Sequence, residues 1–279
     1  MTFTIRSTFP FALFVGKFSF AFIRVIRGPL NTMVKKPLLG SHQRSWIWGR
    51  NLVAETLRAG TWRPHELRVT SEAASELQPL AVSQGIPVHI ESAGRLTQLC
   101  DAADHQGVLA KMPPFPYADA ATLIDEASAG RIVLITDHLQ DPYNFGAIIR
   151  SAEGFGVAGV VIPKTRQVGV TSQVARSSAG AVNHIPIARV DDLLSLAGEL
   201  KRRGVKLVAA SEHAATPLSN ADLTGPVAII VGNEGVGVER ALLEQCDMAT
   251  AIPLAGQVGS LNAAVAAGIV LYEVTRWKR

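Results

Sequence analysis

Residues 132–150, IVLITDHLQDPYNFGAIIR, contain an apolar run, a polar turn and an amphipathic segment in direct succession. The run Ile132–Thr136 predicts a strand, and the pair Asp141-Pro142 is typical of a turn. Residues 144–155 then place apolar side chains at helical spacing. A strand followed at once by a helix is the repeating unit of α/β proteins, so this stretch sets the fold class of the chain.

The same alternation continues towards the C-terminus. Further strands are predicted at 157–162, 185–187, 206–210, 227–231 and 251–254, and further helices at 171–181, 191–203 and 261–277. The runs 206–210 and 227–231 are apolar almost throughout, which is typical of parallel strands that are buried on both faces. We therefore expect an α/β domain with a parallel sheet that helices cover.

A second, smaller α/β unit is predicted before residue 113. It comprises a helix near residues 52–57, strands at 66–70, 87–90 and 107–110, and a helix at 75–84. Three prolines between Pro113 and Pro116 favour a stiff, extended linker. The expected organisation is a small domain at 41–112, a linker at 113–118 and a larger domain at 119–279.

Residues 1–40 form a basic, phenylalanine-rich N-terminal extension. The first 54 residues hold eight Lys and Arg and no acidic residue, so the net charge of +4 would be −4 without them. Charge alone is therefore weak evidence that the folded body binds nucleic acid. In a membrane helix Lys17 would cost about 2.5–3.5 kcal/mol. Translation that starts at Met33, disorder, a targeting peptide and a membrane anchor all stay open for this extension.

The bulk composition is that of a folded globular protein, with 48% hydrophobic and 18% charged residues. Cys100 and Cys246 form neither a CxxC pair nor a zinc-binding spacing. This pattern favours free thiols in a reducing cytosol. We expect a cytoplasmic protein without a bound metal.

Polar and glycine residues follow three of the predicted strands, where open α/β sheets bind their ligands. Asn144 and Arg150 follow the first of these strands, and Arg150 is a candidate for contact with a phosphate or a ribose. A helix cap at Asn144, and a solvent-exposed or salt-bridged side chain at Arg150, are the alternatives.

The second segment, 232–237, contains three glycines, which let backbone approach a ligand closely. It lacks both the Gly-Lys-Ser/Thr of a phosphate loop and the GxGxxG of dinucleotide-binding proteins, which argues against an NAD-dependent dehydrogenase. The third segment, 252–262, runs into the final helix, where Ser260 is either a helix cap or a site residue.

The three segments contain the motifs DPxNxGAIxRSAxxFG at 141–156, GxEGxGV at 232–238 and IPLxGxVxSLN at 252–262. In this order and spacing they resemble the SpoU/TrmH branch of the SPOUT methyltransferases. The resemblance spans residue 132 to about residue 277. It implies a trefoil-knotted domain, a homodimer, the cofactor S-adenosylmethionine, and methyl transfer to a ribose 2′-hydroxyl of structured RNA.

The resemblance also implies roles for individual residues. Backbone near Gly232, Ile252 and Leu261 would contact the cofactor. The catalytic set would consist of five polar residues: Asn144, Arg150, Glu234, Ser260 and Asn262. The small domain, with the segment HQGV at 105–108, resembles the L30e-like RNA-binding domain of the guanosine 2′-O-methyltransferases that act on 23S ribosomal RNA.

Two other functions stay open. The first is a methyltransferase that acts on transfer RNA, although the extra N-terminal domain favours large-subunit ribosomal RNA, because the resembling tRNA enzymes are compact and rely on short terminal extensions. A non-catalytic RNA-binding or ribosome-assembly protein would retain the fold without the chemistry. The sequence identifies neither the target nucleotide nor the group that accepts the proton of the 2′-hydroxyl.

Overall fold

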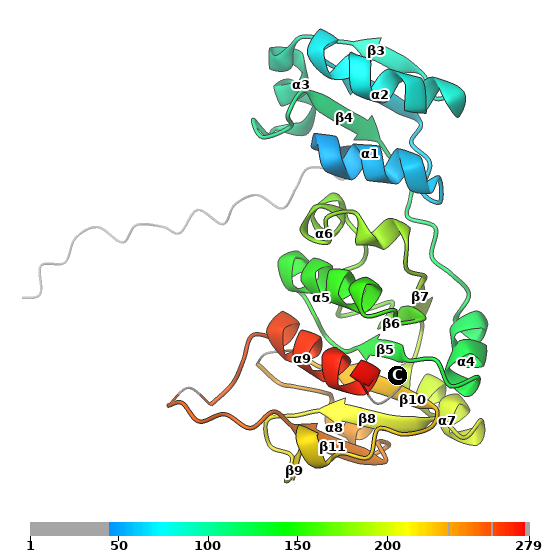
Figure 1. The fold of residues 1–279 in the computed structure, drawn as a ribbon, viewed down its shortest axis with the longest axis vertical. Coiled ribbons are helices and arrows are strands. Elements are labelled where there is room, and N and C mark those ends of the chain that lie inside the picture. The colour runs from blue at the N-terminus through cyan, green and yellow to red at the C-terminus, as the bar shows by residue number, and fades with distance from the viewer. Residues whose placement is uncertain (1–44, 234, 258, 277–279) are drawn as a thin grey trace, which may run out of the picture. The chain divides into compact units, whose positions relative to one another are not determined.

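The computed structural model describes residues 45–233, 235–257 and 259–276. These residues form two sheets with their own helices (Figure 1). The N-terminal extension expected at 1–40 and the catalytic candidate Glu234 lie outside the described residues. None of the helices described combines the length and the apolar character that a bilayer crossing requires.

The smaller sheet has the strand order β1-β4-β2-β3, in which β4 is antiparallel to β1 and β2, and β2 is parallel to β3. Its elements are β1 (Trp46–Trp48), α1 (Arg50–Ala59), β2 (Glu66–Val69), α2 (Ser71–Ser83), β3 (Val88–Ile90), α3 (Ala93–Cys100) and β4 (Val108–Lys111). The sequence predicted three of these strands and missed β1. All three residues of β1 are buried, so the strand has no alternating pattern that could reveal it.

The larger sheet has seven strands in the order β7-β6-β5-β10-β8-β11-β9, and each adjacent pair is parallel. Its strands are β5 (Val133–Thr136), β6 (Gly159–Pro163), β7 (Ile187–Val190), β8 (Lys206–Ala210), β9 (Thr216–Pro217), β10 (Val227–Val231) and β11 (Met248–Ala251). The α/β class with a parallel sheet is confirmed.

Helices cover both faces of this sheet (Figure 1). The helices are α4 (Ala120–Ser128), α5 (Pro142–Gly154), α6 (Ser172–Ser177), α7 (Leu193–Arg202), α8 (Arg240–Leu243) and α9 (Ala263–Arg276). In β10, Ile229 belongs to the core cluster that contains residues of α5 and α9, whereas Ile230 belongs to the cluster with α4, α7 and α8. The prediction that the apolar strands are buried on both faces is confirmed.

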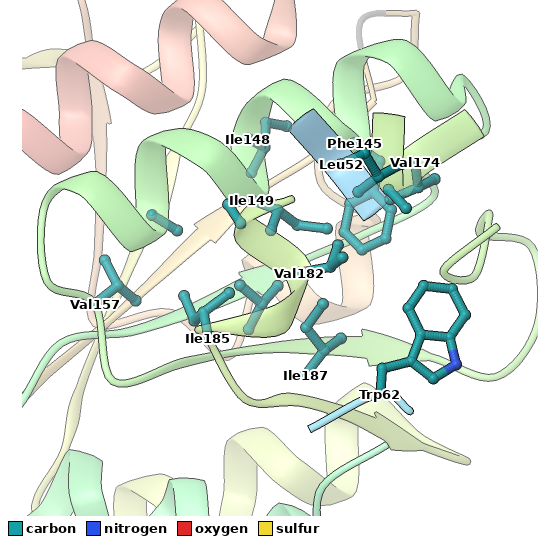
Figure 2. Close-up of a cluster of buried hydrophobic side chains, with 14 of the residues drawn as sticks. Leu52, Trp62, Phe145, Ile148, Ile149, Val157, Val174, Val182, Ile185 and Ile187 are labelled. Carbon is teal, nitrogen blue, oxygen red and sulfur yellow. The ribbon is translucent and has the colours of Figure 1, made fainter. Parts of the chain in front are cut away.

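One buried cluster joins residues that are far apart in sequence. Phe145 and Ile149 of α5 lie with Leu52 and Trp62, which belong to the region of the smaller sheet (Figure 2). The Asn183 side chain also donates a hydrogen bond to Thr56 Oγ1 at 3.1 Å. Burial of each large apolar side chain contributes about 1.5–3 kcal/mol. The shared cluster therefore stabilises the packing of this region against α5.

Two predicted strands are misplaced, and a proline explains each difference. The last strand ends at Ala251 and does not extend over 251–254, since Pro253 cannot donate a ladder hydrogen bond. The strand predicted at 185–187 begins only at Ile187, after Pro186. The first shift leaves residues 252–257 and 259–262 outside helices and strands.

Candidate active site

A cavity of about 510 Å³ lies at the carboxyl ends of β8, β10 and β11. Described residues from three segments at the ends of these strands line it, together with the start of α9: 210–213, 231–233 with 235–238, and 250–254 with 256 and 259–261. Parallel sheets bind ligands at this edge, and small-molecule pockets measure about 300–1,000 Å³. The size and position of the cavity therefore fit a nucleoside-sized cofactor.

The loop after β10 is folded tightly against itself. Asn233 and Gly237 exchange two backbone hydrogen bonds of 3.1 and 2.8 Å, and Asn233 Oδ1 accepts a third from Gly235 N at 2.7 Å. A Cβ on Gly232 would collide with the backbone of Gly237 and Val238. Glycine is therefore required at position 232 for a reason internal to the loop, and this loop forms one wall of the cavity.

The loop after β11 forms the opposite part of the lining. Ile252 and Leu261 are half-buried and line the cavity, and the exposed Ser260 lines it beside Leu261. The structure thus brings Gly232, Ile252 and Leu261 together around one cavity, although the first and the last are 29 positions apart in the sequence.

Two catalytic candidates contact each other directly. Asn262 Nδ2 donates a hydrogen bond to Asn144 Oδ1 at 2.9 Å, where the start of α9 meets the start of α5. Asn262 Oδ1 also accepts from Ala264 N and Val265 N, so it is the cap of α9. Asp141 caps α5 by accepting from the backbone of Asn144, which excludes the alternative that Asn144 is the cap.

Arg150 lies further along α5 and is exposed. Its guanidinium makes no hydrogen bond or ion pair to any residue that the structure describes, and it is not among the residues that line the cavity. The salt-bridged alternative for Arg150 therefore finds no support within the described ranges. An exposed guanidinium that pairs with no described residue is available for a phosphate.

The family of the chain follows from comparison with known proteins. Residues 131–272 match the model of the SpoU rRNA methylase family, and residues 46–118 match the model for the substrate-binding region of RNA 2′-O ribose methyltransferases. The chain belongs to the SpoU rRNA methylase family. It is therefore an RNA methyltransferase, and the expected cofactor is confirmed, because SpoU methyltransferases use S-adenosylmethionine.

Similar SpoU proteins occur in several bacteria. YacO of Bacillus subtilis, assigned to the TrmH family of tRNA/rRNA methyltransferases, is 39% identical over 85% of this chain and 97% of its own length. An AdoMet-bound rRNA methyltransferase from Sinorhizobium meliloti has a TM-score of 0.72 at 26% identity, covering 83% of this chain and 86% of that one. AviRb from Streptomyces viridochromogenes with AdoMet has a TM-score of 0.71 at 26% identity, with coverage of 84% and 90%.

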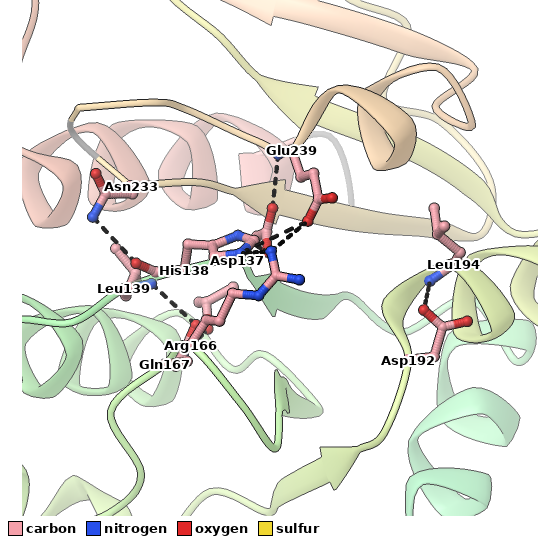
Figure 3. Close-up of polar contacts among 10 residues, drawn as sticks. Asp137, His138, Leu139, Arg166, Gln167, Asp192, Leu194, Asn233 and Glu239 are labelled. Atoms are coloured by element: carbon pink, nitrogen blue, oxygen red, sulfur yellow. Dashed lines mark hydrogen bonds and ion pairs between the residues drawn. The ribbon is translucent and has the colours of Figure 1, made fainter.

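Sequence analysis of this SpoU chain missed two parts of the site. The segment Ala210–His213 lines the cavity, and its position directly after an apolar strand was a usable signal. A polar cluster of Asp137, His138, Arg166 and Glu239 lies behind the glycine loop (Figure 3). The four residues come from three separate segments. Only Asp137 and His138 directly follow a predicted strand, so only these two could have been predicted from the sequence.

Proposed function

We propose that this enzyme transfers a methyl group from S-adenosylmethionine to the ribose 2′-hydroxyl of a guanosine in 23S ribosomal RNA. The observation that supports this most is the single cavity lined by Gly232, Ile252 and Leu261, with Ser260 at the same wall. The Asn144–Asn262 hydrogen bond then ties the start of α5 to the chain that leaves this wall. Three polar candidates are thus near the residues assigned to the cofactor: Ser260 in the cavity lining, Asn262 next to Leu261, and Asn144 through its bond to Asn262.

When bound, the cofactor supplies an electrophilic methyl group, so the protein has to align the hydroxyl and manage one proton. An arginine side chain stays protonated at neutral pH and is a poor base. We therefore assign the Arg150 guanidinium to the phosphate beside the target ribose, where it stabilises developing charge on the 2′-oxygen while the proton passes to that phosphate. The target ribose is oriented by Asn144, Ser260 and Asn262, and the last two also orient the loop after β11. Glu234 supports the loop after β10, which holds the cofactor.

The substrate assignment rests on the smaller α/β region. Its match to a substrate-binding model at 46–118 favours a large structured RNA. We propose a small RNA-binding domain at 41–112, a linker at 113–118 and the methyltransferase domain at 119–279, preceded by the extension at 1–40. Transfer RNA stays the second candidate, because relatives such as YacO carry the combined description tRNA/rRNA methyltransferase.

A cytoplasmic homodimer without a bound metal completes the proposal. Ala147 and Ser151 of α5 and Val265, Ile269 and Tyr272 of α9 line an apolar groove, and the three α9 side chains are exposed. A groove that combines small side chains with exposed apolar side chains is suited to close packing against a second copy of the chain.

The role of Arg150 is tested with Arg150→Ala. We expect the variant to bind S-adenosylmethionine with the affinity of the parent, because the cavity lining is unchanged, and to lose at least about 100-fold in methyl transfer to RNA. Calorimetry and transfer of labelled methyl to total RNA measure the two quantities. Near-normal turnover of Arg150→Ala would show that the assigned role is wrong.

The substrate is tested by mapping 2′-O-methyl groups in ribosomal and transfer RNA from a strain that lacks the gene. Loss of one 23S guanosine methylation supports the proposal, and loss of a tRNA methylation supports the second candidate. No loss in either RNA, together with no transfer by the purified protein, would favour a non-catalytic RNA-binding or assembly factor.

A further inference from the structure

A buried carboxylate lies directly behind the glycine loop of the cavity. Asp137 follows β5 and is only 2% exposed. Its backbone N–H donates to Val231 O at 2.9 Å, and its Oδ2 accepts from Glu239 N at 2.8 Å (Figure 3). These two hydrogen bonds hold the chain immediately before and immediately after residues 232–238. Asp137 therefore fixes both ends of the loop.

The neighbouring residue holds the same loop from a third point. His138 O accepts a hydrogen bond from Asn233 Nδ2 at 3.1 Å, while His138 Nδ1 lies 2.6 Å from Asp137 Oδ1. His138 has a φ of +60°, a conformation that costs energy for a residue other than glycine. Such a conformation persists when surrounding contacts enforce it. Here it turns the imidazole back onto Asp137 and the carbonyl towards Asn233.

Arg166 closes this cluster on the solvent side. Its Nη1 lies 3.2 Å from His138 Nε2 and 3.7 Å from Glu239 Oε2. Because a guanidinium can only donate, Nε2 accepts and the imidazole proton lies on Nδ1, facing Asp137. Asp137, His138 and Glu239 are residue types that bind metal ions, and their ligand atoms lie close together. The Arg166 guanidinium already supplies positive charge beside these side chains. The geometry therefore favours a cluster that holds the loop in place over a metal site.

We propose that Asp137 is a positioning residue that sets the cofactor-binding conformation of residues 232–238. The inference rests on the proposal that the cavity holds the cofactor. The loop contributes Gly232 and Gly237, which have only backbone atoms, to the cavity lining, and backbone binds a ligand more tightly when its conformation is fixed beforehand. Without the Asp137 bonds, the loop has to be ordered when the cofactor binds, and affinity falls by that cost.

The primary test is Asp137→Asn in the full chain. Asparagine keeps the size of the side chain, but its single acceptor oxygen cannot serve both Glu239 N and His138 Nδ1. We expect the dissociation constant for S-adenosylmethionine, measured by calorimetry without RNA, to rise about tenfold, while kcat at saturating cofactor stays within about twofold. Asp191→Asn is the matched control, because Asp191 lies at the same sheet edge, pairs with Lys164 and does not contact the loop.

A second pair of variants separates the backbone of Glu239 from its side chain. Glu239 has a φ of −54°, which proline adopts, so Glu239→Pro removes the N–H that bonds Asp137 and keeps φ. Glu239→Ala keeps that N–H. We expect about a tenfold loss of cofactor affinity for Glu239→Pro and less than about a twofold loss for Glu239→Ala. The double variant Asp137→Ala/Glu239→Pro should lose no more cofactor affinity than Asp137→Ala, since alanine has already removed the acceptor of the Glu239 N–H.

Hydrogen exchange adds a readout that does not depend on the cofactor. Peptides over 232–239 should exchange faster in Asp137→Asn than in the parent, while peptides over 252–257 stay unchanged. Cofactor affinity within twofold of the parent for Asp137→Asn, or additive losses in the double variant, would overturn the inference alone. A parent protein that binds no cofactor would instead overturn the proposed function.

Discussion

The two loops that enclose the cavity differ in how the fold holds them. Residues 232–239 make hydrogen bonds within the loop and to Asp137 and His138. Between Pro253 and Leu261, by contrast, the described residues make no hydrogen bond to the rest of the described chain, and nearly all are exposed. Leu261 is followed by Asn262, whose side chain is bonded to Asn144. The second loop is therefore anchored at its ends and open between them.

The two loops therefore contribute to the cavity in different ways. The loop after β10 is ordered by the protein before any ligand arrives, so it contributes contacts without an ordering cost. The described residues of the loop after β11 lack such hydrogen bonds, which suits the side of a site that has to admit both a cofactor and a large RNA.

The largest effect is expected from Gly232→Ala. The added Cβ would collide with backbone at Gly237 and Val238, which cannot yield because the loop is closed by its own hydrogen bonds. We expect a loss of cofactor affinity of at least about 100-fold, near 3 kcal/mol, measured by calorimetry. Gly259→Ala in the open loop is the control, since a Cβ there meets nothing within 4 Å. Equal losses in both variants would refute the contrast.

A smaller effect is expected where the open loop is anchored. Asn262→Asp keeps an acceptor for the N-terminus of α9 but cannot donate to Asn144 Oδ1. We expect the free energy of unfolding to change by less than about 0.5 kcal/mol and methyl transfer to fall about tenfold. Asn262→Ala removes the cap as well and should destabilise the fold by about 1 kcal/mol. Thermal unfolding and transfer assays separate these outcomes.

Hydrogen exchange should distinguish the loops in the parent protein. Amides of residues 232–239 are expected to be protected without ligand, and those of 253–257 to exchange at near-unprotected rates. Addition of S-adenosylmethionine should slow exchange in 253–257 more than in 232–239, because only the open loop has order to gain. The same gain of protection in both loops would contradict the contrast.

The smallest effect is expected at the tip of the ordered loop. Val236 is 78% exposed, so Val236→Ser removes little buried surface. We expect its free energy of unfolding to stay within about 0.5 kcal/mol of the parent value. Cofactor affinity should stay within about twofold, because the loop is held at its ends and not at its tip. A large loss of affinity would mean that the side chain at the tip contacts the ligand directly.

The sequence predicted the centre of the larger sheet well and its edges poorly. The strands at 206–210 and 227–231 were predicted with the bounds that the structure has, since continuous apolar runs of this length are typical of central parallel strands. The edge strand β9 has only two residues and therefore no periodic signal. In the smaller sheet, β1 is buried along its whole length and has no alternating pattern either. Helix α4 was also missed, although Asp119 caps it.

The sequence alone specified the fold class and two of the three cavity segments, those after β10 and β11, because apolar periodicity, glycines and local motifs identify them. Tertiary structure alone decided that Asp141 and not Asn144 caps α5, that Asn144 bonds Asn262, and that Asp137 holds Glu239. Each of the latter two contacts joins residues more than 100 positions apart. Periodicity indicates only which face of an element is buried. Hydrogen bonds between distant residues depend on the strand order of the sheet, which brings the ends of separate strands together.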